Sequence, residues 1–428
     1  MHELSGIMTE TPAFFLRAGY HPYDAAVNCR EDVPPFFRLS KSEGKAGRSG
    51  DVTKYQKESW YNDTKLDRRT TIDMPKKKML LMKGNEALAE AAIHAGCRFY
   101  AGYPITPQNE IPEYLSRRMP EVEGIFIQAE SELAAVNMVY GAAATGARAM
   151  TSSSSPGISL KQEAISFLAG AELPAVIVNI QRGGPGLGNI TASQADYFQA
   201  VKGGGHGDYH CLVFSPFNLQ EMWDLTMRAF DKADQYRTPV MILGDGVVGQ
   251  MMEPFHPTPY KRPRLPRKNW VLNGAKGRRP RVIRSLCMGP GELEQKNLVL
   301  QNKYELMKKH EVMFEAYDTK DARLIVVAFG IAARIGLSAV KELRKEGGRI
   351  GLFRPITLFP FPAKQIAALA GKGRRFMVVE MNAGQMVEDV RLALNGRADV
   401  QFYGRPGGVV FTPEELHVKI KAAYTKKK

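Results

Sequence analysis

The chain has 428 residues, of which 44% are hydrophobic and 24% are charged. This length allows two or three domains, and the composition is that of an ordinary globular protein. No apolar run is long enough to cross a bilayer, and the N-terminus lacks the basic-then-apolar order of a signal peptide. We therefore expect a cytoplasmic protein with no membrane partner.

The net charge of +15 raises the alternative of a nucleic-acid-binding or scaffold protein. Much of this charge, however, lies in one segment, because residues 256–285 contain ten Lys or Arg and no Asp or Glu. A basic linker that contacts a partner or an acidic cofactor explains this segment at least as well as a nucleic-acid-binding face does. We therefore expect no nucleic-acid partner.

The four cysteines, Cys29, Cys97, Cys211 and Cys287, are far apart in the sequence. No CxxC pair is present to bind zinc or an iron–sulfur cluster, so we predict no metal site in this chain. Cysteines used in this way are typical of a reducing compartment.

Residues 1–78 differ from the rest, because they mix Pro, Ser, charged and aromatic residues without a helical or strand period. We predict a weakly ordered extension there, and a translation start at Met74 or Met79 is an alternative. From 79 to 255, alternating strands and helices predict an α/β domain, a parallel sheet with helices on both faces. The expected strands are 98–101, 125–128, 148–151, 174–180, 211–214 and 240–244, and the expected helices are 85–95, 109–117, one opening at Ser131, 158–168 and 219–236.

Residues 256–320 are predicted to form a basic linker and a helical connection, the latter at 293–309. A smaller α/β domain is expected at 321–428, with strands 324–329, 349–353, 376–380 and 400–403 and a helix after Thr412. Structural roles are expected in it for Arg354, Glu380 and Gln385.

The stretch 125–157 organises the first domain. Its helix is apolar nearly all the way round, which predicts a helix buried in the core. Two carboxylates, Glu130 and Glu132, lie at the helix start. Acidic groups there are favourable by about 0.3–1 kcal/mol, but a carboxylate held in a dry place also gains a shifted pKa and strong hydrogen bonds. The segment alone favours the electrostatic interpretation. The neighbouring loops favour the functional interpretation, in which the carboxylate belongs to a site.

Four loops follow strands of this domain and are therefore expected at one edge of the sheet, where α/β folds bind ligands. They are GYPITP (102–107), QAESE (128–132), SSSSPG (152–157) and QRGGPG (181–186). The first offers Tyr103 and Thr106, and the third brings hydroxyl and N–H groups to a helix start, where anions bind. Arg182 directly follows a buried strand, where a guanidinium fork suits a carboxylate or phosphate.

Two further features carry weaker signals. The glycines at 183, 184, 186 and 188 do not form GxGxxG, so a dinucleotide fingerprint is absent. His206 is a candidate base or proton carrier, although a loop histidine is more often solvated.

The motifs GYPITP, ESELAA, SSSSPGISLKQE, QRGGPGLGN and GGGHGD occur in this order, followed by AKGRR, LFRPITLFPFP, VVEMNAGQMVEDVR and FYGRPGG. Together they resemble the alpha-type subunit of 2-oxoacid:ferredoxin oxidoreductases, and more closely that of the branched-chain (3-methyl-2-oxobutanoate, or 2-ketoisovalerate) enzymes. The resemblance runs from about Met79 to Tyr424. It implies a pyrimidine-type thiamine-diphosphate-binding domain, followed by a transketolase C-terminal-like α/β domain.

In such an enzyme, the resemblance implies, this subunit binds the thiamine pyrimidine and a beta subunit holds the diphosphate and Mg²⁺. Glu132 would bond the pyrimidine N1′, with Glu130 less favoured, so that the cofactor's own 4′-imino group can take the C2 proton. The resemblance further assigns cofactor contacts to Tyr103, Pro104 and Ile105, and substrate contacts to Thr106, Arg182 and Thr191.

The resemblance also implies [4Fe–4S] clusters in partner subunits, a small ferredoxin-like iron–sulfur subunit, a gamma subunit, CoA as co-substrate and external ferredoxin as electron acceptor. The same machinery acting on 2-oxoglutarate or an aryl pyruvate is the alternative. Gly244-Asp-Gly246, with Asn269 and Asn273 downstream, is similar to the start of a thiamine-diphosphate magnesium motif. We expect no magnesium there, because the sequence that follows is Pro-rich and basic and predicts no helix.

Overall fold

The computed structural model describes residues 79–371 and 373–426, and the predicted extension at 1–78 lies outside them. Seven strands form the first sheet, in the order β12-β6-β7-β5-β4-β2-β3. All are parallel except β12, which pairs antiparallel with β6. The strands are β2 (Phe99–Gly102), β3 (Ile125–Gln128), β4 (Ala149–Ser153), β5 (Ala175–Gln181), β6 (Leu212–Phe214), β7 (Pro239–Asp245) and β12 (Thr357–Phe359).

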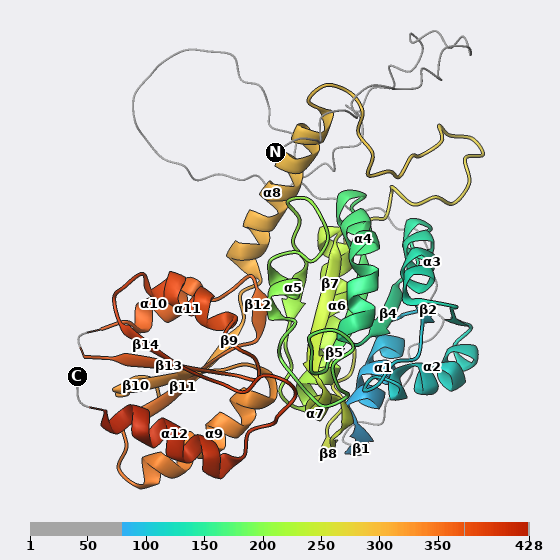
Figure 1. Ribbon diagram of the computed structural model, residues 1–428. Helices are drawn as coiled ribbons and strands as arrows, with labels where there is room; N and C mark the ends of the chain where they lie inside the picture. Colours follow the sequence, from blue (N-terminus) through green and yellow to red (C-terminus); the bar gives the residue numbers. More distant parts are fainter. Residues whose placement is uncertain (1–78, 372, 427–428) are drawn as a thin grey trace, which may run out of the picture. The chain divides into compact units, whose positions relative to one another are not determined.

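Helices cover both faces of this sheet, as predicted (Figure 1). Successive residues of β5 point to opposite faces, so that Val176 and Val178 pack into one hydrophobic cluster while Ile177 packs into the other. One cluster includes α1 (Gly84–His94), α2 (Glu110–Glu121) and α6 (Leu219–Tyr236), and the other includes α3 (Glu132–Ala144), α4 (Ser155–Gly170) and α5 (Tyr197–Val201).

The second sheet has the order β14-β13-β10-β11-β9, and only β9 is antiparallel to its neighbour. Its strands are β9 (Phe314–Tyr317), β10 (Leu324–Val327), β11 (Ile350–Pro355), β13 (Arg375–Glu380) and β14 (Asp399–Gly404). α9 (Gly330–Lys345) and α12 (Pro413–Thr425) pack on one face, and α10 (Ala363–Leu369) and α11 (Met386–Leu394) on the other. The long connecting helix α8 (Glu292–His310) precedes this sheet.

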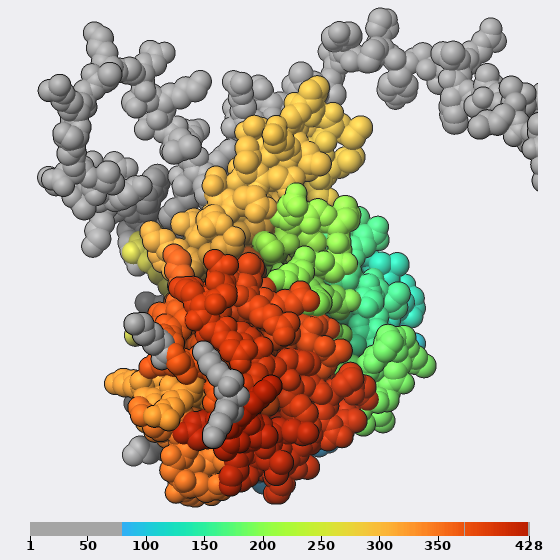
Figure 2. Space-filling view, turned by 60° about the vertical axis from the view of Figure 1, so that its left-hand side comes forward, coloured from blue at the N-terminus to red at the C-terminus, as the bar shows by residue number. Residues whose placement is uncertain are grey.

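Several short elements were not predicted from the sequence. They are the antiparallel pair β1 (Leu80–Lys83) and β8 (Met252–Phe255), and also β9, β12, α5 and α7 (Gly246–Gln250). The strand β12 follows β11 in the chain but joins the first sheet, where Thr357 pairs with Phe214. A strand of three residues is too short to show a period, and its pairing is a tertiary contact. In the space-filling view, residues of the C-terminal α/β segment (red) border residues of the first sheet and its helices (green) (Figure 2).

The prediction that the helix opening at Ser131 is buried all round is wrong. Val136 and Val139 of α3 are fully buried, but Leu133 is 45% exposed, and Asn137 and Gly141 on the same side are also exposed. Within this chain the helix therefore buries one side and leaves the side that carries Leu133 exposed. None of the helices in the described ranges is both long and apolar enough to span a membrane.

Candidate functional site at the carboxyl edge of the first sheet

The loops that follow β2, β3, β4 and β5 lie at one edge of the first sheet, because these strands are parallel neighbours. Hydrogen bonds join three of them. Arg182 Nη1 donates to the carbonyl of Thr106 at 3.0 Å, which links the last loop to the first. The backbone N–H of Arg182 donates to Ser155 Oγ at 3.0 Å, which links it to the serine-rich segment. The predicted convergence of the four loops is therefore present.

Glu132 is the first residue of α3 and is buried, with 6% exposure. Ser131 caps the helix by accepting a hydrogen bond from Ala134 N at 3.1 Å, which holds Glu132 in the first turn. A Cβ at Gly157 would lie 2.5 Å from Oε1 of Glu132, so only glycine leaves room for this carboxylate. Glu130, by contrast, is exposed. The two candidate carboxylates therefore differ in burial, and only Glu132 is enclosed by the site.

The serine-rich segment is not the loop that we predicted. β4 runs through Ser153 and α4 begins at Ser155, three residues earlier than predicted. Ser152 Oγ lies 2.7 Å from Tyr100 Oη and donates to Gln108 Oε1 at 2.6 Å. These buried bonds fasten the GYPITP loop to β4.

The N-terminus of α4 is closed by the protein's own groups. Asn179 Oδ1, from β5, accepts from the N–H of Ser155 at 3.1 Å, and Ser155 Oγ donates to Asp196 at 2.6 Å. Asn179 also donates to Asp196 at 2.8 Å, and burial raises the pKa of this carboxyl. The predicted anion site at this helix start is therefore wrong, since its first N–H is used and a carboxyl lies beside it. Asn179 and Asp196 were missed because their roles arise only from tertiary contacts.

Some buried polar atoms at this edge have no hydrogen-bond partner within the described part of the chain. They include the hydroxyl oxygens of Ser153 and Ser154 and the Nε of Arg182. Buried polar groups are nearly always paired, so an unpaired cluster beside a buried carboxylate indicates a place for a polar ligand. Ser153 lies close to the Glu132 carboxylate, because a Cβ at Gly157 would be 2.1 Å from its Oγ and 2.5 Å from Glu132 Oε1.

Arg182 is 6% exposed, and its two terminal nitrogens donate to the carbonyls of Thr106 and Leu187, each at 3.0 Å. It thus holds the first loop against the glycine-rich loop. The sequence suggested that the guanidinium fork points at a ligand, but both of its terminal nitrogens are bonded within the protein. The donor that remains without a partner is Nε.

The remaining predicted residues line the rim. Tyr103 is 37% exposed, Pro104 is exposed, and Ile105 and Thr106 are half-buried. Thr191 ends the glycine-rich loop, and its carbonyl accepts from the N–H of Gly183 at 2.9 Å.

The glycine-rich loop is also held by the C-terminal α/β segment. Asn189 Nδ2 donates to the carbonyl of Gly407 at 2.7 Å. A Cβ at Gly408, whose φ is +83°, would lie 2.1 Å from Thr191 Oγ1. These two glycines let the FYGRPGG motif approach the site closely.

Lys161 was not singled out from the sequence. It is fully buried in α4, and its Nζ donates to Thr151 Oγ1 at 2.7 Å and to the carbonyl of Ser152 at 3.2 Å. Burial lowers the pKa of Lys161 to about 7, against the opposing effect of the Glu132 carboxylate. The available signal was a lone lysine four residues after Gly157, on the apolar face of a buried helix.

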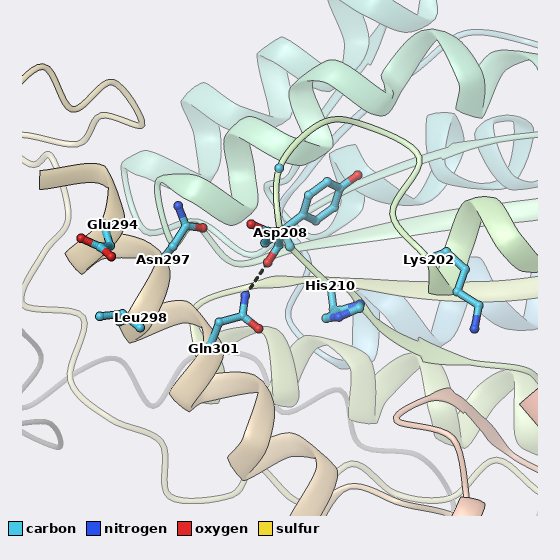
Figure 3. Close-up of a pocket in the computed structure, with 9 residues that line it drawn as sticks. Lys202, Asp208, His210, Glu294, Asn297, Leu298 and Gln301 are labelled. Atoms are coloured by element: carbon cyan, nitrogen blue, oxygen red, sulfur yellow. Dashed lines mark hydrogen bonds between the residues drawn. The ribbon is translucent and has the colours of Figure 1, made fainter. Parts of the chain in front are cut away.

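His206 does not lie at this edge. It is exposed, and its Nδ1 is 3.5 Å from Ser166 Oγ, eleven residues along α4 from Ser155 or roughly 16 Å of helix. A separate polar pocket lies nearby, where Gln301 Nε2 of α8 donates to the carbonyl of Asp208 at 2.6 Å (Figure 3). Because its residue His210 precedes β6, this pocket is at the amino edge of the sheet, opposite Glu132.

The Gly244-Asp-Gly246 motif has a structural role in this chain. Its aspartate, Asp245, is fully buried and accepts from the N–H groups of Val248 at 3.0 Å and Ile331 at 2.9 Å. The expectation that no helix follows is wrong, because α7 begins at Gly246. Asp245 thus caps both α7 and α9, and burial raises its pKa to about 6.

A parallel α/β sheet with a buried carboxylate at its carboxyl edge, followed by a second α/β sheet, defines the class as an α/β protein that binds a ligand at this edge. Residues 90–317 match the thiamine-diphosphate-binding domain of pyruvate flavodoxin/ferredoxin oxidoreductase. Residues 322–416 match core domain II of pyruvate:ferredoxin oxidoreductase. The chain belongs to the thiamine-diphosphate-dependent 2-oxoacid:ferredoxin oxidoreductase family and is an oxidoreductase subunit, which confirms the resemblance and the fold class.

Relatives in multi-subunit oxidoreductases support this assignment. The chain is 51% identical over 341 residues to the ketoisovalerate oxidoreductase subunit VorB of Methanothermobacter thermautotrophicus, covering 80% of this chain and 97% of the relative. It is 36% identical over 376 residues to the 2-oxoglutarate synthase subunit KorA of the same organism, covering 78% and 96%. The 2-oxoglutarate:ferredoxin oxidoreductase of Magnetococcus marinus, solved with 2-oxoglutarate, coenzyme A and succinyl-CoA bound, matches with a TM-score of 0.74 and 25% identity, over 85% of this chain and 68% of that chain.

Proposed function

We propose that this chain is the pyrimidine-binding subunit of a branched-chain 2-oxoacid:ferredoxin oxidoreductase, which converts 3-methyl-2-oxobutanoate and CoA to an acyl-CoA and CO₂ and reduces ferredoxin. The observation that carries the proposal is the buried Glu132, set against Gly157 beside unpaired polar atoms. The name of the VorB relative supports the substrate class.

The site suits the pyrimidine end of thiamine diphosphate better than its diphosphate end. A carboxylate pairs with a protonated ring nitrogen, and the free hydroxyls of Ser153 and Ser154 can donate or accept a hydrogen bond at a polar ligand. Two acidic side chains, Glu132 and Asp196, lie at this edge and disfavour a diphosphate. The diphosphate and Mg²⁺ are therefore assigned to a beta subunit.

When bound, thiamine supplies the carbon nucleophile that attacks the 2-oxoacid carbonyl. Glu132 holds a proton at the pyrimidine N1′, and a buried carboxylate does this strongly because water does not compete. Arg182, with its free Nε, is assigned to the substrate carboxylate, and Thr106 and Thr191 to the substrate oxygens. Tyr103, Pro104 and Ile105 are assigned to the cofactor ring.

Exposed apolar side chains surround the site and suit burial by a partner subunit. They are Tyr103, Leu133, Leu160, Leu187 and Ile190. We assign this surface to the beta subunit. The [4Fe–4S] clusters are assigned to partner subunits, which include the small ferredoxin-like and gamma subunits, because the four cysteines here are widely separated. CoA is the acyl acceptor, and external ferredoxin takes the electrons.

The alternative function is 2-oxoglutarate oxidation, which the KorA relatives and the Magnetococcus marinus structure keep open. A distal carboxylate needs a second cation. The chain is 51% identical to the VorB relative and 36% identical to the KorA relative, and this difference favours a branched 2-oxoacid.

The test is dye reduction by the complex reconstituted with its partner subunits and CoA, with 3-methyl-2-oxobutanoate, 2-oxoglutarate and pyruvate as substrates. We expect kcat/KM for the branched 2-oxoacid to exceed the others by about 10-fold or more, the range that apolar side-chain contacts provide. A preference for 2-oxoglutarate would establish the alternative. The isolated chain should show neither iron absorption nor tight thiamine diphosphate binding, and either result would contradict the half-site assignment.

A further inference from the structure

Lys161 and Glu132 face the same space between α3 and α4. The Cβ position of Gly157 points at the Glu132 carboxylate, at 2.5 Å from Oε1. Residues four apart lie on one face of a helix, so Lys161 lies one turn further along α4 on the face that meets Glu132. Because α4 begins at the carboxyl edge and runs away from it, Lys161 lies further from this edge of the sheet than Gly157, beneath the carboxylate.

The charge of Lys161 is not neutralised by its direct contacts. Its two hydrogen bonds, at 2.7 and 3.2 Å, go to the neutral oxygens of Thr151 and Ser152. Buried charges are normally paired, because an ammonium group loses its hydration on burial. Lys303, also buried, shows the usual solution, since its Nζ lies 2.8 Å from Glu172 Oε2. No ion pair of this kind is formed by Lys161 among the residues of the described ranges.

The charged groups around Lys161 are few. From α3 the facing charge is Glu132, which opposes the lowering of the Lys161 pKa by burial. Nearer the start of α4 lies Asp196, which accepts a hydrogen bond from Ser155. The hydroxyl of Tyr209, from the loop over α4, lies 3.3 Å from Gln162 Oε1, and burial raises its pKa, so it stays neutral.

We propose that Lys161 is a positioning residue for Glu132, whose positive charge biases the proton that the carboxylate shares with the thiamine pyrimidine. This inference rests on the proposed function, since it requires Glu132 to meet that ring. A cation beneath the carboxylate disfavours a further positive charge on the protonated ring. The ring therefore loses its 4′ proton at a lower pH than it would without Lys161, which favours the neutral imino form needed for catalysis.

The experiment is a pH titration of the reconstituted complex with bound thiamine diphosphate, followed by circular dichroism of the imino form of the pyrimidine. In Lys161→Met the midpoint should rise by up to about one pH unit, the effect of removing one charge roughly 10 Å away at an effective dielectric constant near 20. The rise should be smaller above pH 7, because the pKa of Lys161 is about 7. A matched control, Lys303→Met, removes a buried lysine elsewhere and should leave the midpoint unchanged.

An unmoved midpoint in an assembled Lys161→Met complex would overturn the proposal, and so would an equal shift in Lys303→Met. If Lys161→Met does not assemble, Lys161→Gln, which keeps a donor for Thr151, is titrated instead. If neither assembles, the proposal is also overturned, because Lys161 is then required for folding. Glu132→Gln separates the two hypotheses, since normal C2–H exchange in that variant defeats the proposed function itself.

Discussion

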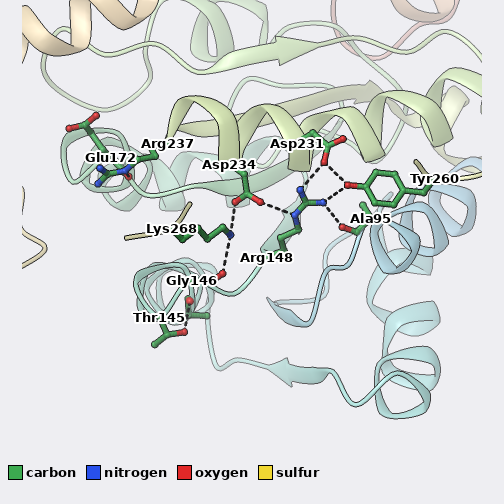
Figure 4. Close-up of polar contacts among 11 residues, drawn as sticks. Ala95, Thr145, Gly146, Arg148, Glu172, Asp231, Asp234, Arg237, Tyr260 and Lys268 are labelled. Carbon is green, nitrogen blue, oxygen red and sulfur yellow. Dashed lines mark hydrogen bonds and ion pairs between the residues drawn. The ribbon is translucent and has the colours of Figure 1, made fainter. Parts of the chain in front are cut away.

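The two ends of β4 each carry a buried charged cluster, and the clusters differ in how fully their polar groups are paired. At the amino end lies Arg148, whose side chain is 5% exposed. Figure 4 shows that its guanidinium group is surrounded by acceptors. They are Asp231 at 2.7 Å, Asp234 at 2.9 Å, Tyr260 Oη at 2.9 Å and the carbonyl of Ala95 at 2.5 Å.

This amino-end cluster also anchors the basic segment 256–285. Lys268 Nζ lies 2.6 Å from Asp234 and donates to the carbonyl of Gly146 at 2.9 Å. Part of the positive charge that suggested a nucleic-acid surface is therefore paired within the fold. At the carboxyl end, by contrast, Ser153, Ser154 and Arg182 keep unpaired polar atoms. Complete pairing indicates a stabilising role, and incomplete pairing beside a carboxylate indicates recognition.

The largest effect is expected at the carboxyl end, from Glu132→Gln. Glutamine keeps the size and hydrogen bonding of Glu132 but cannot share a proton, so turnover and C2–H exchange of bound thiamine should fall by about 10²–10⁴-fold. Turnover with viologen dye and hydrogen exchange in the reconstituted complex measure this. The exposed Glu130→Gln is the control and should be mild. If Glu132→Gln instead keeps its turnover and loses only about 0.3–1 kcal/mol of stability, the carboxylate acts only on the helix dipole. The electrostatic interpretation would then hold.

Arg148→Met tests the amino end. It leaves Asp231 and Asp234 without their shared partner and should lower the free energy of unfolding by about 3–5 kcal/mol. Urea unfolding measures the change, and turnover per assembled complex should stay near normal. Arg344→Met, which breaks a more exposed pair with Asp321, is the control and should change stability by less than about 1 kcal/mol. A selective loss of catalysis in Arg148→Met would contradict the comparison.

Arg182→Ala removes the donor that joins two loops at the site. We expect kcat/KM to fall by about 10–100-fold for every 2-oxoacid alike, since hydrogen bonds to charged groups contribute about 1.5–3 kcal/mol. Kinetics with branched and dicarboxylic 2-oxoacids measure the change. Arg405→Ala, which removes a half-exposed partner of Glu415 on a nearby loop, should have little effect. An effect confined to 2-oxoglutarate would mean that Arg182 binds a distal carboxylate.

Asp245, at the carboxyl end of β7, offers a pH test of stability. Its folded-state pKa is raised to about 6 from an ordinary value near 4, so between these pH values the folded protein holds more protons than the unfolded chain. Its contribution to stability is therefore fully present below pH 4 and is lost as pH rises through 6, by on the order of 2–3 kcal/mol. Unfolding of Asp245→Asn at pH 4.5 and pH 7 should show a smaller decline than the parent protein. Equal declines would contradict the shift.

The smallest effect is expected from removing residues 1–78. The family match begins at residue 90, and 80% of this chain covers 97% of the VorB relative. A chain beginning at Met79 should assemble and turn over within about twofold of the full chain. Loss of assembly or activity would show that the extension is an integral part of the fold.

The local sequence determined those helices and strands whose caps and hydrophobic periods lie within the element itself. The helix expected at 219–236 has those bounds in the structure, because its amphipathic period begins after Asn218, whose Oδ1 accepts from Glu221 N at 2.8 Å. The strand at 125–128 also has its predicted bounds. The ordered motifs were enough to recognise the family and to choose Glu132 over Glu130.

The tertiary structure alone decided which groups meet across the fold. It brought Gly157 against Glu132, placed Lys161 beneath them, closed the start of α4 with Asn179, and sent β12 to the first sheet. Except for the turn of α4 that joins Gly157 to Lys161, these contacts join residues separated by 24 to 143 positions in the sequence. No periodicity along the chain therefore encodes them. Burial and pairing depend on the summed packing of many elements, and for that reason they could not be predicted from the local pattern.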